Sequence, residues 1–292
     1  MKVLQDPQLA SAMPAVHDGD GKQMQLPPAP NTADANLSGY FDRELQELSS
    51  GMLAEVLQNG KDVRFASGSV YKGQWKGSQR HGFGRQAWPD GAVFEGQWKE
   101  NRAEGNGRFT HSDGDTYVGQ WRQNVANGNG IYHHKDLTTY QGSWVNDLQE
   151  GFGVEKWVEG TRFEGSFRQG QKEGHGLYCW PDGSQYLGGW QKNTINGKGV
   201  YRGNDGRMYK GTWQDSVIHG LGKYSWPNGR DYAGHYLFDR KDGFGIFGWP
   251  DGRRYEGYWS HGRQHGQGRS RMKDSSYVYG TWTEGKREGE AS

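Results

Sequence analysis

The fold is decided by a short pattern that reads Tyr-Lys-Gly-Gln-Trp at residues 71–75 and returns as Phe-Glu-Gly-Gln-Trp at residues 94–98. Nine of the ten copies are followed by a Gly-x-Gly triplet, and most of these by a turn of the Asp-Gly type; Asp136-Leu137 lacks the turn glycine. Ten copies recur at an unvarying spacing of 23 residues. A fixed period of this length is typical of repeat proteins and takes precedence over any local motif. The copies begin at Tyr71, Phe94, Tyr117, Tyr140, Phe163, Tyr186, Tyr209, Tyr232, Tyr255 and Val278.

The alternation within one copy predicts two short antiparallel strands. Counted from the first aromatic residue, positions 1, 3 and 5 share one face of a strand, and positions 12, 14 and 16 share one face of the next. Pairing across a six-residue loop sets Trp opposite Gly, Gly opposite Gly and ring opposite ring, so that rings cover bare glycine backbone. The Asp-Gly connection needs three residues, with glycine in a left-handed bulge, because two would place the next ring on the wrong face.

The repeat therefore predicts an all-β fold: an elongated single-layer antiparallel meander of about ten 23-residue hairpins over residues 63–289. The composition agrees with this fold, because only 32% of the residues are hydrophobic while 14% are aromatic and 49 are glycine. Burial must then depend on large rings rather than on a Leu, Ile and Val core.

The first 60 residues lie outside the repeat. Residues 1–37 are expected to be a disordered tail, since a Pro-rich stretch at residues 27–30 and its neighbours have little to bury. Residues 38–60 are expected to form an amphipathic helix that either caps the first hairpin or docks into another protein. Its apolar stripe consists of Leu45, Leu48, Met52, Leu53 and Val56.

The consensus Tyr-x-Gly-x-Trp, His-Gly-x-Gly and Asp-Gly at this period resembles the MORN (membrane occupation and recognition nexus) repeat. The first copy matches nearly throughout, with His-Gly-Phe-Gly at residues 81–84 and Pro-Asp-Gly at residues 89–91. Phe167 and Tyr236 depart from it by replacing Trp. The resemblance implies a repeat-only scaffold protein, similar to the MORN proteins of ciliary radial spoke heads. We expect the truncated last copy to leave an open edge that supports self-association.

Several function classes are disfavoured by the same sequence. With 35 basic and 34 acidic residues and a net charge of +1, the chain lacks the clustered basic surface of a nucleic-acid-binding protein. We expect no catalytic residues, no metal site and no cofactor, because the recurrent Asp residues occupy turns and the recurrent His residues are too far apart to share a metal. The absence of a signal peptide or a transmembrane run predicts a cytoplasmic protein of the cytoskeleton or a cilium.

The leading hypothesis is a non-enzymatic scaffold that holds protein partners in a large intracellular assembly, cytoskeletal or axonemal. The alternative is a peripheral membrane adaptor that binds anionic phospholipids weakly through basic residues such as Arg253 and Arg254. The candidate partner-binding surface is the aromatic face, formed by Tyr71, Trp75, Phe94, Trp98, Tyr117, Trp121, Tyr140, Trp144, Tyr186, Trp190, Tyr209, Trp213, Tyr255 and Trp259.

Overall fold

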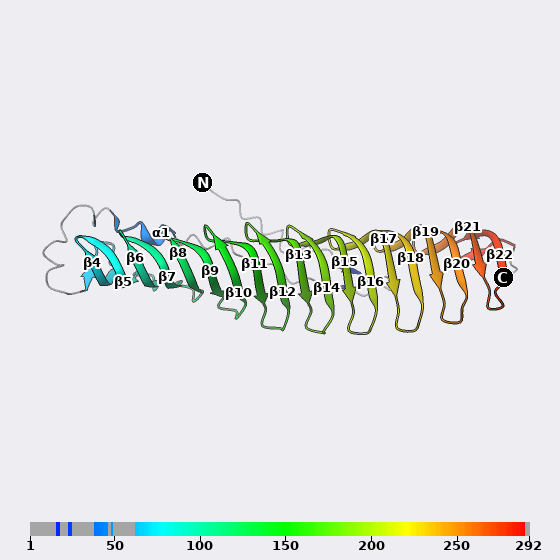
Figure 1. The fold of residues 1–292 in the computed structure, drawn as a ribbon, viewed down its shortest axis with the longest axis horizontal. Helices are drawn as coiled ribbons and strands as arrows, with labels where there is room; N and C mark the ends of the chain where they lie inside the picture. Colours follow the sequence, from blue (N-terminus) through cyan, green and yellow to red (C-terminus); the bar gives the residue numbers. More distant parts are fainter. Residues whose placement is uncertain (1–15, 18–22, 25–37, 46–47, 49–61, 290–292) are drawn as a thin grey trace. The chain divides into compact units, whose positions relative to one another are not determined.

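The predicted all-β repeat fold is confirmed by a computed structural model, which describes residues 16–17, 23–24, 38–45, 48 and 62–289. The described chain divides into two compact units, one of residues 30–171 and one of residues 1–29 with 172–292. Each unit is a meander in which strands pair antiparallel with their neighbours in sequence (Figure 1).

Among its described residues, the unit of residues 30–171 contains one short helix, a two-residue strand and the nine strands that follow it. The helix is α1 (Ser38–Phe41). The strands are β3 (Val63–Arg64), β4 (Val70–Lys76), β5 (Gln79–Ala87), β6 (Val93–Lys99), β7 (Arg102–Thr110), β8 (Thr116–Arg122), β9 (Val125–His133), β10 (Thr139–Val145), β11 (Leu148–Lys156) and β12 (Arg162–Arg168).

The second unit repeats the same design. Its array consists of β13 (Gln171–Cys179), β14 (Gln185–Gln191), β15 (Thr194–Arg202), β16 (Met208–Gln214), β17 (Val217–Ser225), β18 (Asp231–Leu237), β19 (Arg240–Gly248), β20 (Arg254–Ser260), β21 (Arg263–Arg271), β22 (Tyr277–Thr283) and β23 (Lys286–Arg287). A small hairpin of β1 (Val16–His17) and β2 (Gln23–Met24) lies against β17.

The first turn of each repeat is tighter than the sequence predicted. Lys99 pairs directly with Arg102, so Glu100 and Asn101 form a two-residue turn, with φ of 50° and 68°. Two positive φ values define a type I′ turn, whose twist matches that of the flanking strands. The expected six-residue loop is therefore wrong. A bulge after Gly96 places Trp98 of β6 opposite Ala103 of β7, within the hairpin. The predicted pairing of Trp with Gly is found instead between β6 and the preceding strand β5, where Trp98 pairs with Gly82.

The second turn has the predicted three-residue form. His111 donates its N–H to the Asp115 carbonyl at 2.8 Å, and Gly114 donates to His111 at 3.1 Å, with φ of 102° at Gly114. Asp113 accepts the N–H of Asp115 through Oδ1 at 3.1 Å, which confirms that this aspartate is a turn residue. The same side-chain contact recurs at Asp90, Asp136, Asp182, Asp205, Asp251 and Asp274.

A row of glycines crosses the sheet beneath the aromatic rings. Gly107, Gly119 and Gly130 are successive partners across three strands. A Cβ on Gly130 would meet atoms of the Tyr117 ring at 2.5 Å, so the ring lies directly on the glycine backbone, as predicted. In residues 63–171 the row consists of Gly73, Gly84, Gly96, Gly107, Gly119, Gly130, Gly142, Gly153 and Gly165.

Polar groups of the rings bond to backbone carbonyls of their own repeat and of the preceding repeat. The Tyr117 hydroxyl donates to the Gln120 carbonyl at 3.0 Å, and Trp121 Nε1 donates to the Gly107 carbonyl of the preceding repeat at 3.1 Å. In six repeats the side chain of the second residue of the tight turn adds a further bond, as where Asn124 Oδ1 accepts the Ala103 N–H at 2.7 Å. These bonds satisfy backbone groups that would otherwise be left unpaired at the bulge.

One of these turn residues should make stability depend on pH. Asp147 takes the place of Asn124 in the next repeat and accepts the Ala126 N–H at 2.6 Å. Burial raises the pKa of Asp147 to about 6, and the Ala126 N–H opposes the rise. The pKa of Asp147 is higher in the folded chain than in the unfolded chain. The contribution of protonated Asp147 to stability is therefore fully present below about pH 4 and is lost as the pH rises through about 6. Asp147→Asn should therefore stabilise the protein by about 1 kcal/mol at pH 7.5, after allowance for solvent screening.

Thermal unfolding from pH 4 to pH 8 checks this prediction. The gain should shrink toward pH 4, because Asp147 is then protonated and resembles Asn. The exposed Asp113→Asn is the matched control and should leave the wild-type pH dependence in place. A gain for Asp147→Asn that is equal at pH 4 and pH 8 would contradict the assignment.

Candidate interaction surfaces

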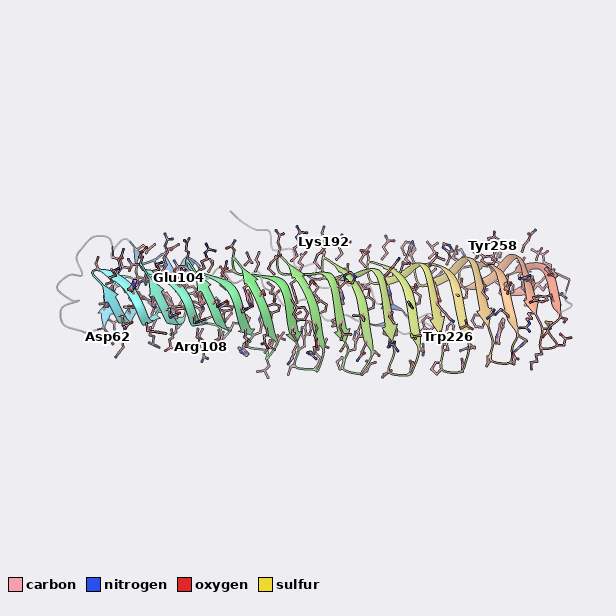
Figure 2. The ribbon with its side chains drawn as sticks, in the orientation of Figure 1. Asp62, Glu104, Arg108, Lys192, Trp226 and Tyr258 are labelled. Atoms are coloured by element: carbon pink, nitrogen blue, oxygen red, sulfur yellow. The ribbon has the colours of Figure 1, made fainter. Side chains whose placement is uncertain are left out.

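The predicted aromatic face is a packed surface in both units. We call the side of the sheet that carries the position 1 and position 5 rings the inner face, and the opposite side the outer face. All fourteen predicted rings lie on the inner face, and all are buried except Trp75, which is half-buried. Side chains project from both long edges of each array, with Glu104 at the edge of the tight turns and Arg108 toward the other (Figure 2). Whether these rings bind a partner remains a prediction.

In the unit of residues 30–171, a segment of the chain itself lies on the inner face. Phe41 is fully buried, and its ring centroid lies 5.2 Å from Phe94, 5.8 Å from Trp98 and 5.7 Å from Trp121. Tyr40 adds ring contacts with Trp88 and Phe109. Such edge-to-face aromatic contacts add to the stabilisation from apolar burial. We call residues 38–48 the N-terminal segment, of which residues 46 and 47 are not described.

A buried ion pair joins this segment to the first repeat. Glu44 and Arg80 have no exposed side-chain surface, and Arg80 Nη1 lies 3.8 Å from Glu44 Oε2. Glu44 Oε1 accepts the hydroxyls of Ser67 and Ser69 at 3.2 and 2.8 Å. Burial lowers the pKa of Arg80 to about 10 and Glu44 opposes this, so Arg80 stays charged at neutral pH. Removing one member of such a pair leaves an uncompensated buried charge.

The sequence located this segment only in part. Of the predicted docking residues, Leu48 is buried and Leu45 is half-buried, while Met52, Leu53 and Val56 lie outside the described residues. The anchors Phe41, Glu44 and Arg80 were missed. Phe41 extends the Leu45 and Leu48 stripe by one helical turn. Arg80 occupies position 10, where other repeats place Ala103, Ala126, Ile195 and Ile218 on the inner face, and an inward arginine signals a buried acid.

The inner face of residues 172–289 contains a cation among rings. Lys241 Nζ lies 5.4 Å from the ring centroid of Trp226 and 5.6 Å from each of the centroids of Tyr232, Phe247 and Trp259. Each ring face attracts a cation at this distance. Lys241 also stands at position 10 of its repeat, the position of Arg80. Variation at this inward position therefore gives different repeats different side-chain chemistry on one backbone.

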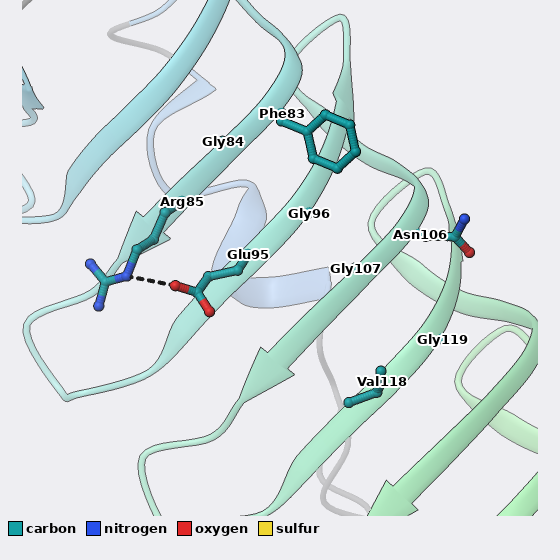
Figure 3. Close-up of a pocket in the computed structure, with 9 residues that line it drawn as sticks. All are labelled: Phe83, Gly84, Arg85, Glu95, Gly96, Asn106, Gly107, Val118 and Gly119. Carbon is teal, nitrogen blue, oxygen red and sulfur yellow. Dashed lines mark hydrogen bonds and ion pairs between the residues drawn. The ribbon is translucent and has the colours of Figure 1, made fainter.

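The outer face of the first unit exposes apolar side chains above the glycine row. Phe83 and Phe152 are each 63% exposed, and Val118 is 42% exposed. Phe83 and Val118 line a shallow hollow of about 660 Å³ over β5–β8, whose floor is glycine backbone (Figure 3). Arg85 and Glu95 close one side of it with an ion pair at 3.1 Å. A second hollow of about 600 Å³ adjoins it over β8–β11, and Val118 borders both.

The second unit exposes apolar groups on its own outer face. Leu221, Phe244 and Tyr258 are 60%, 49% and 54% exposed, and the rings of Phe244 and Tyr258 lie 5.9 Å apart. Exposed apolar clusters of this kind are a common property of protein-binding surfaces.

A half-buried carboxylate in the unit of residues 30–171, Asp115, serves structural contacts. Asp115 Oδ2 accepts the Tyr132 hydroxyl at 2.9 Å and pairs with His134 Nδ1 at 3.1 Å. Burial raises the pKa of Asp115, but the Lys135 N–H, Tyr132 and His134 outweigh it and hold the pKa below its usual value. No group of three His, Cys, Asp or Glu side chains among the described residues is placed to hold a metal ion. Within the same residues, no helix is long and apolar enough to span a membrane.

The fold places the protein in the class of β-hairpin repeat arrays. Its side chains form two surfaces, the inner face and the outer face. The chain belongs to the MORN repeat family, whose sequence profile matches ten stretches over residues 71–291. These are residues 71–93, 94–116, 117–139, 140–162, 163–185, 186–206, 209–229, 232–253, 255–277 and 279–291. No curated protein matched the chain.

Among solved structures, the chain is similar to TCP domains at low identity. The wild-type TCP10 domain of Danio rerio CPAP is 12% identical with a TM-score of 0.40, over 75% of this chain and 97% of that chain. The SAS-4 TCP domain of Drosophila melanogaster, in complex with a proline-rich motif of Ana2, is 14% identical with a TM-score of 0.34, over 60% of this chain and 89% of that chain.

Proposed function

We propose that this protein is a non-enzymatic scaffold subunit that holds protein partners in a large intracellular assembly of the cytoskeleton or a cilium. The observation that carries the proposal is the N-terminal segment on the inner face, where Phe41 and Leu48 are buried against the array and Glu44 pairs with Arg80. This contact supports the use of the inner face as a surface for short peptide segments, through apolar anchors and a central charge.

The repeated architecture supports the same role. Each repeat adds a similar pair of strands, while its outward and inward variable positions differ from those of its neighbours. Arrays of this kind provide long surfaces that can contact several partners at once. The predicted self-association through the C-terminal edge remains part of this proposal.

The alternative is a peripheral adaptor on anionic membranes, and ion pairing argues against it. Arg253 and Lys273 lie 2.9 and 3.3 Å from Asp251, and Arg269 pairs with Glu256. Acidic neighbours weaken the field of a basic cluster, and anionic lipid recognition commonly uses about 4–8 clustered basic residues. Lipid binding is therefore the alternative that the vesicle flotation experiment below tests.

Two measurements on the full chain test the proposed function. Affinity capture from an extract of ciliated cells should recover a reproducible set of cytoskeletal or axonemal proteins in detergent. Flotation with neutral vesicles and with vesicles containing phosphatidylserine should leave the protein unbound in both cases. Strong, salt-sensitive flotation that is lost in Arg253→Glu/Arg254→Glu would replace the scaffold proposal with the membrane adaptor.

A further inference from the structure

We propose that the inner face over β4–β9 is a binding site for a helical segment with an aromatic residue, an acidic residue three positions later and an aliphatic residue four positions after that. The N-terminal segment, with Phe41, Glu44 and Leu48, is its resident occupant, which a partner segment of the same pattern displaces. This inference rests on the proposed function, because it names the kind of partner that the scaffold would hold.

The acid-binding element of this site belongs to the sheet itself. Arg80 Nη1 donates to Gln86 Oε1 at 3.1 Å, and Nη2 donates to the Asn101 carbonyl at 3.0 Å. The guanidinium also lies over the Trp98 ring, 4.4 Å from its centroid. Nη2 also donates to the Phe41 carbonyl of the N-terminal segment at 3.5 Å, but the shorter bonds of the guanidinium are those with the sheet. A carboxylate ligand therefore meets a preorganised partner, which lowers the entropic cost of binding.

The aromatic pocket beside Arg80 is similarly specific to these repeats. Phe41 contacts Trp98 and Trp121, which belong to the second and third repeats. In those two repeats the inward position 10 is alanine, Ala103 and Ala126, whereas the next repeats place Gln149 and Lys172 there. Small residues leave room for an inserted ring. The position of the pocket next to Arg80 fixes the spacing between the aromatic and the acidic residue of a ligand.

The resident segment is held incompletely, which makes exchange feasible. Glu44 Oε2 and Arg80 Nε are buried and have no hydrogen-bond partner, and the 3.8 Å between Arg80 Nη1 and Glu44 Oε2 is longer than a hydrogen bond. Helix α1 has four residues, too few to be stable without the sheet. The outer contacts are an Arg43–Asp90 ion pair at 3.7 Å and an Asn124–Asp42 hydrogen bond at 3.4 Å, both weak. A partner helix that satisfies Arg80 fully would bind more tightly.

The test measures binding of a fluorescent peptide of residues 36–50 to the full chain by anisotropy. A variant of the full chain carries Phe41→Ala, Glu44→Gln and Leu48→Ala, which remove the contacts of the N-terminal segment with the inner face. We call this variant the vacated chain. We expect it to bind the peptide at least about tenfold more tightly than the wild-type chain, whose site is occupied. A Glu44→Gln peptide should bind at least about tenfold more weakly. Adding Arg80→Gln to the vacated chain should abolish this discrimination. An Arg43→Ala peptide is the matched control and should bind almost normally.

Three outcomes would overturn the inference: equal binding to the wild-type and vacated chains, no binding to either, or equal binding of the unaltered peptide and the Glu44→Gln peptide. If the vacated chain fails to show wild-type thermal unfolding of the array, a chain with a specific protease site between residues 50 and 60 replaces it. After cleavage, the labelled peptide should exchange with the wild-type N-terminal fragment, and failure to exchange would count against the inference. Protein capture without peptide binding would reject this inference and leave the scaffold proposal standing.

Discussion

Replacing Gly119 by alanine is expected to destabilise the unit of residues 30–171 by about 3 kcal/mol or more. A Cβ on Gly119 would lie 2.5 Å from the Cα of Gly130 and 2.6 Å from the Tyr117 hydroxyl. The Cα of Gly130 is a backbone atom. It cannot move away, because Gly130 is paired with Gly119 on one side and with Gly142 on the other. The strands must therefore separate or the Tyr117 ring must leave its glycines. Urea unfolding followed by circular dichroism measures the loss.

Gly77 provides the matched control. It lies in a tight turn with φ of 60°, and a Cβ there would meet nothing within 4 Å. Other repeats place Glu100 or Gln123 at this position with φ of 50°. Gly77→Glu should therefore change stability by less than about 1 kcal/mol. If Gly119→Ala were equally mild, the close contact between ring and glycine row would not be what holds the repeats.

Replacing Trp121 by alanine is expected to cost about 3–5 kcal/mol, the usual range for a buried aromatic side chain. Trp121 is 2% exposed and packs against Phe94 at 5.1 Å and Tyr117 at 5.2 Å between centroids. Its loss also leaves the Gly107 carbonyl without the Nε1 donor. Because Phe41 contacts the same ring, the N-terminal segment should be released as well. Hydrogen exchange at Leu45 and Leu48 amides reports that release.

The same substitution at Trp75 is the comparison. Trp75 stands at the same repeat position but is half-buried and has its ring contact with Tyr71 at 4.9 Å. Trp75→Ala should cost less than half as much as Trp121→Ala, since less apolar surface is lost. Equal losses at the two sites would show that burial by neighbouring repeats does not determine the contribution of these tryptophans.

The repeat pattern predicted the strands and one of the two turns correctly. Alternation at positions 1, 3 and 5 is a local property, so it was enough to predict which side chains lie on the inner face. The length of the Asp-Gly turn followed because only an odd number of residues returns the next ring to the same face. The tight turn was misjudged because Glu100, Asn101, Gln123 and Asn124 are not the glycines expected at positive φ. Strand twist on both sides of the turn imposes that conformation on non-glycine residues.

The candidate site was harder to predict, because it joins residues distant in sequence. Leu45 and Leu48 could be identified from helical spacing, but spacing says nothing about where their stripe packs. Glu44 and Arg80 are 36 positions apart, and although position 10 marks Arg80 as inward, Glu44 alone resembles an ordinary surface charge. Only the folded array shows that both are removed from solvent and face each other.

The sequence by itself determined the period, the meander and the glycine row beneath the rings, because each follows from alternation and turn chemistry within 23 residues. The tertiary structure alone decided what lies on the inner face of the first repeats. Burial of Phe41 depends on Phe94, Trp98 and Trp121 from two repeats meeting around one ring. Such a pocket exists only after the strands have paired, since no single repeat contains enough apolar surface to bury an inserted side chain.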